Sequence, residues 1–274
     1  MKRTRVGLFA LAATGSLVLA LTAPAVEAAQ GTGIPTFEEF QASTFRDVDG
    51  QYIVNGDEPL AGTDALRSYY QGMVGTAPTK INPAGLVVNT VRGADDKWSR
   101  AKVGRLTYCV SNKFGSRKAA VVRAATQGAA LWERASSAVD YVRVSSAEAN
   151  CTTRNTRVVF SIEPTRSQAF IARAFFPSSP DVRRNIKVNP VSLLTTPDWP
   201  PGNILGHELG HTLGFRHEHT RPEAGVLCFE NLSWRPLTDY DSASIMHYPQ
   251  CNGTSLDLSF TATDAEGVQA LYGP

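Results

Sequence analysis

The order of apolar and polar residues along the chain predicts three helices. Residues 116–138 carry apolar side chains at steps of three and four, the spacing of an amphipathic helix. These side chains are Val121, Ala125, Ala129 and Trp132. A second helix is predicted to open at Pro200 and to run to Gly214. A third is expected near the C-terminus, where Thr263 and Glu266 have the spacing of a capping box.

Four stretches are predicted to form strands, because they are apolar throughout or alternate between apolar and polar residues. They are residues 106–110, 139–144, 157–162 and 169–176. The chain from 215 to 261 is rich in turn residues and lacks periodicity. Strands with one helix, then a second helix, an irregular region and a final helix together indicate an α+β fold.

Residues 1–28 are predicted to be a signal peptide. A basic start is followed by an almost unbroken apolar run over residues 6–20 and by small residues over 23–29, which suit signal-peptidase cleavage. An uncleaved membrane anchor is the alternative. No later stretch is long and apolar enough to span a bilayer. The mature protein is therefore expected to be secreted and to have no membrane partner.

Residues 29–92 are predicted to be a loosely structured leader with one short helix over 64–71, followed by the main domain over 93–274. Residues 30–92 contain seven acids and four bases, whereas residues 93–274 contain seventeen acids and twenty bases. This difference in net charge could help the leader to dock. It is far too small to indicate nucleic acid or a membrane surface as a partner.

The four cysteines all lie in the main domain, at Cys109, Cys151, Cys228 and Cys251. An even number in an exported chain indicates two disulfides, for which three connectivities are possible. The pairs Cys109–Cys151 and Cys228–Cys251 are favoured because they close the shorter loops. Cysteine ligation of a metal is the alternative, although the chain has no CxxC pair.

The strongest chemical signal is the segment His207–His217, with the sequence HELGHTLGFRH. His207 and His211 are four residues apart on the predicted helix, so both imidazoles can reach one ion from the same face. Gly214 can end the helix in the left-handed conformation, which lets His217 approach from another direction. Three histidine ligands with an open fourth position are typical of catalytic zinc. All five histidines of the chain lie between residues 207 and 247.

Glu208 directly follows the first of these histidines, which places its carboxylate near a metal-bound water. A bound zinc ion lowers the pKa of its water to about 7 and polarises a substrate carbonyl. We expect Glu208 to act as general base toward that water and then to deliver the proton to the leaving amine.

The extended motif resembles that of the metzincins, a group of zinc peptidases that also carry a downstream Met-turn. The sequence SIMHY at residues 244–248 resembles that turn, with Met246 as its methionine. Ordinary core packing of Met246 is the alternative. Within the group, the chain most resembles the astacin family. The marks of that family are a glutamate directly after the third histidine, here Glu218, and a tyrosine two residues after the methionine, here Tyr248.

The resemblance implies a metzincin-like fold: a twisted mixed sheet with two long helices, above an irregular C-terminal subdomain that ends in a helix. It implies that Tyr248 is a fifth zinc ligand, which swings away to hydrogen-bond the oxyanion during catalysis. It also implies that Glu218 lies near the mature N-terminus, and that residues 169–176 form the edge strand to which extended substrate adds. A packed Tyr248 and a solvated Glu218 are the alternatives.

The match to the astacin family weakens after Glu218. Arg221 and Pro222 agree with the family pattern, but His219 stands in place of a glutamine, and a later Arg-Asp pair is missing. His219 is interpreted as a surface residue or a neighbour of the ligands rather than a ligand. The polar network that the family builds around the mature N-terminus is therefore not expected in its usual form.

The leader contains no cysteine, which excludes the cysteine-based latency of the matrixins. Astacin leaders use an aspartate within a Phe-x-Gly-Asp motif, and the nearest match here is VNGD, which ends at Asp57. The hypothesis is that Asp57 ligates zinc in the zymogen, and the alternative is a plain Asn-Gly turn. Activation would need a cut between Lys80 and Lys97, with Arg92 as one candidate.

The sequence thus predicts a secreted zinc-dependent endopeptidase, made as a zymogen, monomeric, with one catalytic Zn²⁺ and protein or peptide substrates. One alternative is a matrixin-like metzincin in which Tyr248 is not a ligand. Another, of a different class, is a non-catalytic secreted zinc-binding module, although such a module would not need Glu208. Basic residues near the expected edge strand hint at acidic substrates. They are Arg166, Arg173, Arg183, Arg184 and Lys187.

Overall fold

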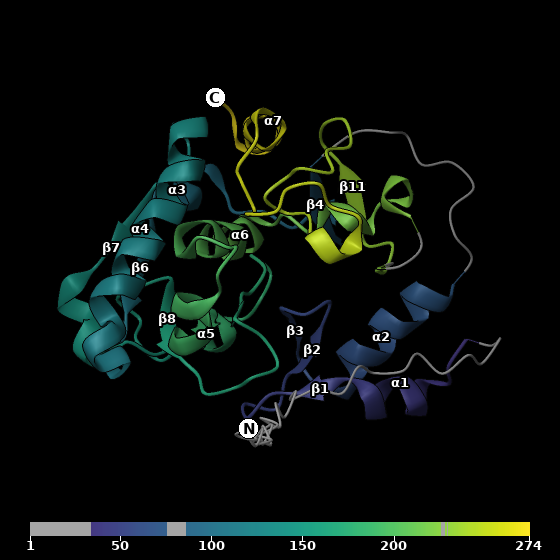
Figure 1. Cartoon of the computed structure of the whole chain (residues 1–274), viewed down its shortest axis with the longest axis horizontal. Coiled ribbons are helices and arrows are strands. Elements are labelled where there is room, and N and C mark those ends of the chain that lie inside the picture. The colour runs from purple at the N-terminus through teal and green to yellow at the C-terminus, as the bar shows by residue number, and fades with distance from the viewer. Residues whose placement is uncertain (1–33, 76–85, 226–227, 229) are drawn as a thin grey trace, which may run out of the picture. The chain divides into compact units, whose positions relative to one another are not determined.

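The main sheet has five strands, four of them parallel, and is shown with the whole chain in the computed structural model of Figure 1. Residues 34–75, 86–225, 228 and 230–274 are described, so the expected signal peptide lies outside the described residues. In spatial order the strands are β7 (Tyr141–Arg143), β6 (Leu106–Val110), β8 (Phe160–Pro164), β10 (Asn185–Val188) and β9 (Ala172–Arg173). The last strand, β9, runs antiparallel to β10 and forms an edge of the sheet.

Three of the four predicted strands are shorter than expected. The stretch 139–144 forms only the three residues of β7. The strand expected from 157 begins at Phe160, because a turn anchored by the Asn155 side chain, which accepts from the Arg157 amide, occupies the residues before it. The stretch 169–176 forms only the two-residue β9, since its partner β10 ends at Val188, just before the N-cap of the next helix. Strand β10 itself was not predicted.

Two long helices lie side by side against this sheet: α4 (Lys118–Ala135) and α6 (Pro201–Leu213), both close to their predicted positions. They approach closely at Gly128, where an added Cβ would lie 2.5 Å from the backbone nitrogen of Gly206. The buried Trp132 of α4 donates its indole N–H to the Gly206 carbonyl. This contact fixes the helix that carries two of the motif histidines against α4.

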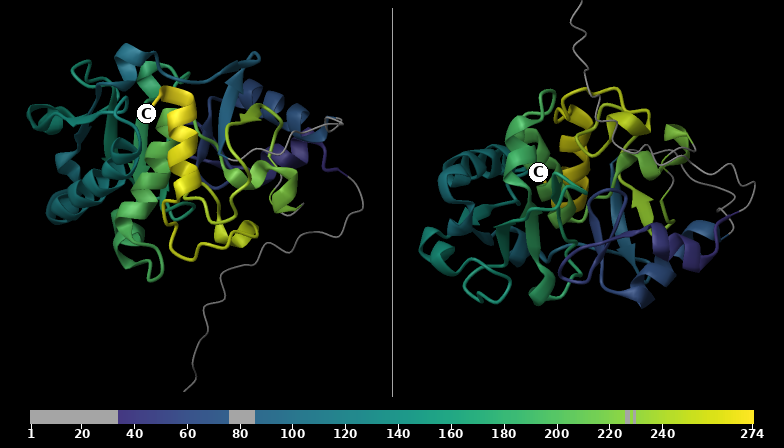
Figure 2. Two further views of the ribbon diagram at one scale, coloured as in Figure 1. Left: turned by 90° about the horizontal axis from the view of Figure 1, so that it is seen from above. Right: turned by 60° about the horizontal axis from the view of Figure 1, so that its bottom comes forward.

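The C-terminal helix α7 (Ala262–Tyr272) lies beside α6, as both views of Figure 2 show, and Tyr272 donates to the Leu213 carbonyl. Its capping box uses Thr261 and Asp264, so the expected pair of Thr263 and Glu266 is wrong by two residues. The extended backbone that an N-cap requires occurs at Thr261.

A second, antiparallel sheet joins the end of the predicted leader to the turn-rich region. Its strands are β11 (Trp234–Pro236), β4 (Val87–Val91) and β5 (Ala94–Asp95). In addition, Val88 forms a bridge with Phe215, and the Arg216 amide donates to the Val87 carbonyl. The start of β4 is therefore built into the region that carries the third motif histidine, and the predicted boundary at Arg92 falls in the turn between β4 and β5.

The sequence suggested that the predicted leader, residues 29–92, is loosely structured, but the described part of it is folded. It contains α1 (Phe37–Ser43), α2 (Thr63–Val74) and a three-stranded antiparallel sheet of β1 (Phe45–Arg46), β2 (Tyr52–Val54) and β3 (Glu58–Leu60). Five buried residues form its own small core: Phe37, Tyr52, Val54, Leu66 and Tyr69. The pattern hid this core because its strands are only two or three residues long. Residues 35–274 form one compact unit.

The remaining elements are short. They are α3 (Arg100–Val103), α5 (Pro190–Thr195) and the 3₁₀ turns η1 (Asn112–Arg117), η2 (Ser145–Asn150), η3 (Asp181–Arg183), η4 (Glu218–Thr220), η5 (Pro222–Ala224) and η7 (Pro249–Cys251). In the described part of the chain, no helix is both long and apolar enough to cross a membrane.

The structure contains the two disulfides that the sequence favoured, Cys109–Cys151 and Cys228–Cys251. The first links β6 to the end of η2, and the second links the turn-rich region to η7. All four cysteines are therefore engaged, and none is free to hold a metal. Two disulfides suit a protein of an oxidising compartment.

Candidate metal centre

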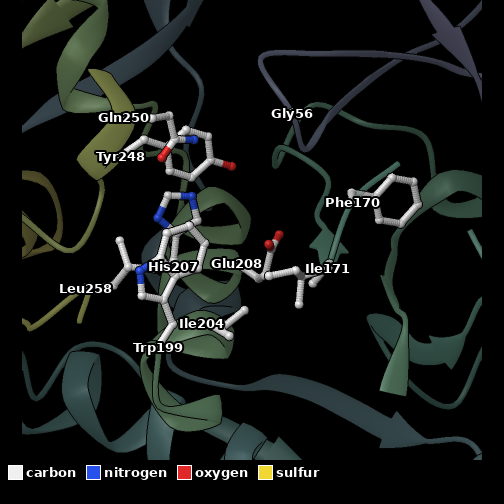
Figure 3. A pocket seen from close by; sticks show the side chains of 11 residues that line it. Gly56, Phe170, Ile171, Trp199, Ile204, His207, Glu208, Tyr248, Gln250 and Leu258 are labelled. Carbon is white, nitrogen blue, oxygen red and sulfur yellow. The ribbon is translucent and has the colours of Figure 1, made fainter. Parts of the chain in front are cut away.

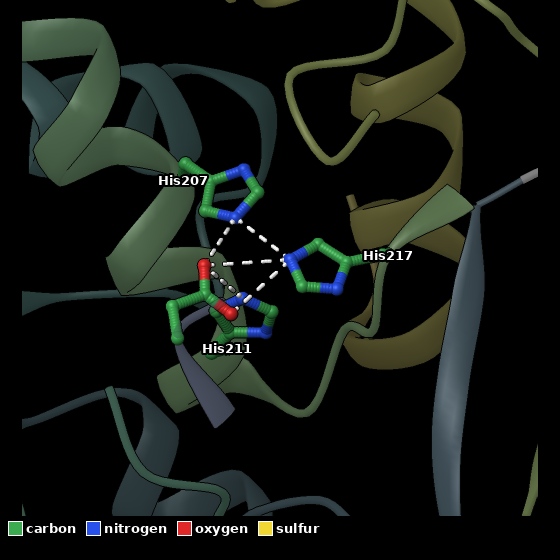
Figure 4. A group of neighbouring side chains, drawn as sticks. His207, His211 and His217 are labelled. Carbon is green, nitrogen blue, oxygen red and sulfur yellow. Dashed lines mark hydrogen bonds and ion pairs between the residues drawn. The ribbon is translucent and has the colours of Figure 1, made fainter. Parts of the chain in front are cut away.

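Helix α6 and the chain reversal after it bring three histidines together. His207 and His211 lie one turn apart on α6, which ends at Gly214 in the left-handed conformation with φ of 103°. A Cβ on Gly214 would lie 2.1 Å from the Asp96 carbonyl oxygen, so both the backbone angle and the close approach require glycine. The reversed chain then delivers His217, and Figure 4 shows the three imidazoles turned toward one another.

The facing ring nitrogens have the spacing of ligands around one ion. The Nε2 atoms of His207 and His217 are 3.2 Å apart. Two ligands of a tetrahedral zinc ion at about 2.05 Å are expected to be about 3.3 Å apart. The Nε2 of His211 is buried without a hydrogen-bond partner. Because a buried, unpaired imidazole nitrogen is unfavourable unless something accepts its lone pair, these residues fit a metal ion.

The Nδ1 atom of each ring, on the side away from the metal centre, has a hydrogen-bond partner. His207 faces the Ile245 carbonyl oxygen at 2.7 Å, and His211 faces that of Phe215 at 2.8 Å. These acceptors require the proton on Nδ1 and leave the Nε2 lone pair free for a metal, the usual arrangement around metal-bound histidine. Burial lowers the pKa of His211 to about 4, which also favours the neutral ring.

The third ring is held by a carboxylate that sequence reasoning missed. Nδ1 of His217 lies 2.7 Å from Oε1 of Glu230, and both side chains are fully buried. Glu230 also accepts from Arg216 at 2.7 Å and lies 3.3 Å from Nε2 of His219. Burial raises the pKa of Glu230, but His217 and Arg216 lower it further, to well below its usual range. Glu230 lies in a turn-rich stretch without periodicity, so the sequence pattern did not indicate that it contacts His217.

The cluster of His217, His219 and Glu230 also has donor atoms close together. The 2.7 Å between Nδ1 of His217 and the Glu230 carboxylate is a direct hydrogen-bond distance, too short for two ligands of one ion. We therefore interpret Glu230 as the partner that orients His217, and the three Nε2 atoms as the metal centre.

Asp57 of the leader reaches into the centre of the three imidazoles. Its Oδ2 lies 3.1 Å from Nε2 of His207 and 3.5 Å from Nε2 of His211, and its Oδ1 lies 3.3 Å from Nε2 of His217. The Asn55–Gly56 turn that presents it has positive φ at both residues. The Asn-Gly turn that the sequence offered as the alternative is thus present, and it presents the Asp57 carboxylate to the three histidines.

Tyr248 stacks on His207 with ring centroids 5.2 Å apart, and its hydroxyl donates to Asp57. Burial and the neighbouring Asp57 raise the pKa of Tyr248 well above its usual range, so the phenol stays protonated. The structure thus brings Tyr248 to the three histidines, with its hydroxyl on the leader carboxylate.

Glu208 lies at the wall of a cavity of about 130 Å³ beside the histidines. Figure 3 shows its carboxylate between His207 and Ile171, with Trp199 lower in the view. Its Oε2 is buried and has no hydrogen-bond partner. Burial and the nearby Asp57 raise the pKa of Glu208 well above its usual range. A buried carboxyl with a shifted pKa at the wall of a cavity is a candidate for proton transfer.

Met246 lies beneath the metal centre, fully buried, in the space left by Gly210 of α6, where an added Cβ would meet its Sδ at 2.5 Å. The turn around it is fixed by Asp264 of α7, which accepts from the Ser244 hydroxyl and from the Ile245 amide. Because the Ile245 carbonyl holds His207, the first turn of α7 helps to position a metal-facing ring.

Glu218 and His219 are both buried, so the interpretations of Glu218 as a solvated carboxylate and of His219 as a surface residue are wrong. Glu218 accepts from the Asp241 amide and lies 3.6 Å from Arg221. His219 stacks on His217 at 4.6 Å and contacts Glu230. His219 is thus a neighbour of a metal-facing ring.

Replacing Glu230 with Gln is expected to weaken metal binding by about tenfold to a hundredfold, because a neutral amide holds the His217 ring less firmly in its metal-binding tautomer. Competition with a chromogenic chelator for Zn²⁺ measures the affinity. Glu223→Gln, which changes a partly exposed carboxylate paired with Arg221, is the control. Equal affinities of Glu230→Gln and the control would show that Glu230 does not position the ring.

Comparison with known proteins gives a distant structural likeness. No family model matches the sequence, and no curated protein matches it. Among solved structures 76 chains match. One of them, described as the structure of myroilysin, has a TM-score of 0.45 and 17% identity, over 68% of this chain and 98% of that chain. Function is therefore inferred below from the side chains at the metal centre.

Proposed function

We propose that this chain is a secreted zinc endopeptidase that is made with an inhibitory leader. The observation that carries the proposal is the meeting of three buried Nε2 atoms beside an unpaired buried glutamate, Glu208, at the wall of a cavity. A purely structural metal site needs only its ligands and has no use for a further carboxyl such as that of Glu208. This favours catalysis over the alternative of a non-catalytic zinc-binding module.

His207, His211 and His217 would hold the zinc ion. When bound, zinc supplies a Lewis acid that polarises the scissile carbonyl and makes water a better nucleophile at neutral pH. Among ligand sets, neutral imidazoles suit zinc and other borderline transition metals rather than Mg²⁺ or Ca²⁺, which favour oxygen donors.

Glu208 would take the proton of the attacking water and pass it to the leaving amine. Its buried Oε2 has no hydrogen-bond partner and lies at the cavity wall, so it is free to accept that proton. After removal of Asp57, the Tyr248 hydroxyl would be free to donate to the oxygen that becomes negative in the transition state.

The peptide would lie along β9, which is the edge of the main sheet and has no strand on its outer side in the described part of the chain. An extended peptide can add to such an edge through backbone hydrogen bonds. The adjoining cavity is lined by Ile171 of this segment and by the apolar side chains of Trp199, Ile204 and Leu258. It is suited to receive an apolar side chain of the substrate.

Asp57 would keep the precursor inactive. In the precursor its carboxylate occupies the position between the three histidines and also accepts from Tyr248, so one leader residue engages two parts of the proposed catalytic apparatus. Burial raises the pKa of Asp57, but His217 and His211 lower it further, to well below its usual range, so the carboxylate stays charged.

We further propose that the leader ends before Leu86. Leu86, Val87 and Val88 are fully buried, and β4 pairs with β11 and bridges to Phe215 beside the metal centre. Loss of this strand would remove part of the framework of His217, so the active enzyme should retain it.

Glu208→Gln should lower kcat/KM on a casein-derived peptide by about 10²–10⁴-fold, because the general base is lost, while one zinc ion per chain is retained. Zinc content by mass spectrometry and the initial rate are measured on the same sample. Glu266→Gln, which alters an exposed carboxylate of α7, should keep full activity. Full activity of Glu208→Gln would rule out this role.

Asp57→Asn should make the uncleaved precursor active, by about tenfold or more over wild type, because breaking a buried ion pair costs several kcal/mol of leader binding. The rate is measured before processing, with the intact mass verified. Asp64→Asn, at an exposed position of α2, is the control and should stay silent. The latency proposal is lost if the Asp57→Asn precursor is as silent as wild type.

N-terminal sequencing of the active secreted form should give a first residue at or before Leu86. A first residue at or after Gly93, following a cut in the turn between β4 and β5, would contradict the proposed boundary.

A further inference from the structure

Arg173 on the edge strand β9 is held by two carboxylates of the leader. Its Nε donates to Oδ2 of Asp47 at 3.0 Å, and its Nη2 donates to Oδ2 of Asp49 at 2.6 Å. The Arg173 side chain is fully buried, and Asp47 is nearly so. The two aspartates lie in the turn between β1 and β2. This turn thus covers an arginine that belongs to the main domain.

Without the leader, Arg173 has one remaining polar partner among the described residues, the neutral amide oxygen of Asn185 at 3.2 Å. Two of the other basic residues near this edge do not depend on the leader. Arg184 pairs with Asp181, and Lys187 lies 2.9 Å from Glu163. Among these three residues, Arg173 alone loses both of its negative partners when the leader departs.

Arg173 lies next to the proposed catalytic groups. Its neighbours Ile171 and Ala172 line the same cavity as Glu208 and His207. Arg173 therefore lies on the strand to which the peptide would add, next to residues that line the cavity beside the metal centre.

We propose that Arg173 forms a carboxylate-binding subsite, which the leader fills with Asp47 and Asp49 and which an acidic side chain of the substrate fills in the processed enzyme. The inference rests on the proposed endopeptidase function and adds the class of substrate. A guanidinium presents several donors in a planar fork that matches a carboxylate, which a neutral side chain cannot replace.

A contact within the main domain supports this preference. Asn185 of β10, the strand that pairs with β9, accepts from the Arg173 guanidinium at 3.2 Å, so this side chain keeps a positioning partner when the leader departs. A carboxylate that pairs with a positioned guanidinium gains charge-assisted hydrogen bonds. The exposed Arg166 should contribute little, because exposed ion pairs are weak. Of the five basic residues that suggested acidic substrates, Arg173 is thus the one that we expect to bind a substrate carboxylate.

The test uses enzyme processed from the secreted full chain and pairs of fluorogenic peptides that differ only in Glu against Gln. The substitution is scanned over three positions on each side of the cut bond. At one position the wild type should cleave the Glu peptide with about tenfold higher kcat/KM, the size expected for a hydrogen bond to a charged group. Arg173→Gln should abolish this ratio, whereas Arg166→Gln should leave it unchanged.

Arg173→Lys is the second variant, because it keeps a positive charge in the enclosed position if Arg173→Gln does not fold. It should reduce the ratio without removing it, since an ammonium lacks the planar fork. Absence of any Glu preference in the wild type, or an unchanged ratio in Arg173→Gln or Arg173→Lys, would overturn the proposal. In either case, continued cleavage of the Gln peptides would leave the endopeptidase function intact.

Discussion

Three buried imidazole nitrogens lie close together, and the Nε2 atoms of His207 and His217 are only 3.2 Å apart. The Nδ1 atom of each ring has a hydrogen-bond partner of its own. The partner is the Ile245 carbonyl for His207, the Phe215 carbonyl for His211 and the Glu230 carboxylate for His217. The lone pairs that remain on the Nε2 atoms repel one another unless a positive charge lies between them. A cation, or a proton shared with a carboxylate, is therefore required for this arrangement to be stable.

The rest of the structure supports this constraint. Gly214 permits the reversal that brings His217 to α6, and Asp264 of α7 fixes the turn whose carbonyl holds His207. Asp57 of the predicted leader lies at the same centre, with its Oδ2 3.1 Å from Nε2 of His207. Its other acidic contacts, with Arg173 and with Arg216 through Glu58 at 3.6 Å, place further leader carboxylates against buried guanidinium groups of the main domain. The leader is thus complementary in charge to the region it covers.

The sequence predicted the meeting of the three histidines better than it predicted the fold around them. The spacing of His207, His211 and His217 sufficed, because helix periodicity and a glycine stop fix their relative directions. Glu230 was missed because its contact with His217 depends on how an irregular stretch folds back, which leaves no period. The leader's small sheet was missed for a similar reason: two- and three-residue strands are too short to alternate. The parallel strand β10 was likewise below the length at which a pattern is visible.

The most direct test of the central claim is the zinc K-edge absorption spectrum of the secreted precursor, with its leader attached. A shell of about four nitrogen and oxygen neighbours near 2.0–2.1 Å, with the multiple-scattering pattern of three imidazoles, is the predicted result. A precursor that retains no zinc after dialysis, or a spectrum without imidazole scattering, would contradict the account of the three histidines as the ligands of one ion.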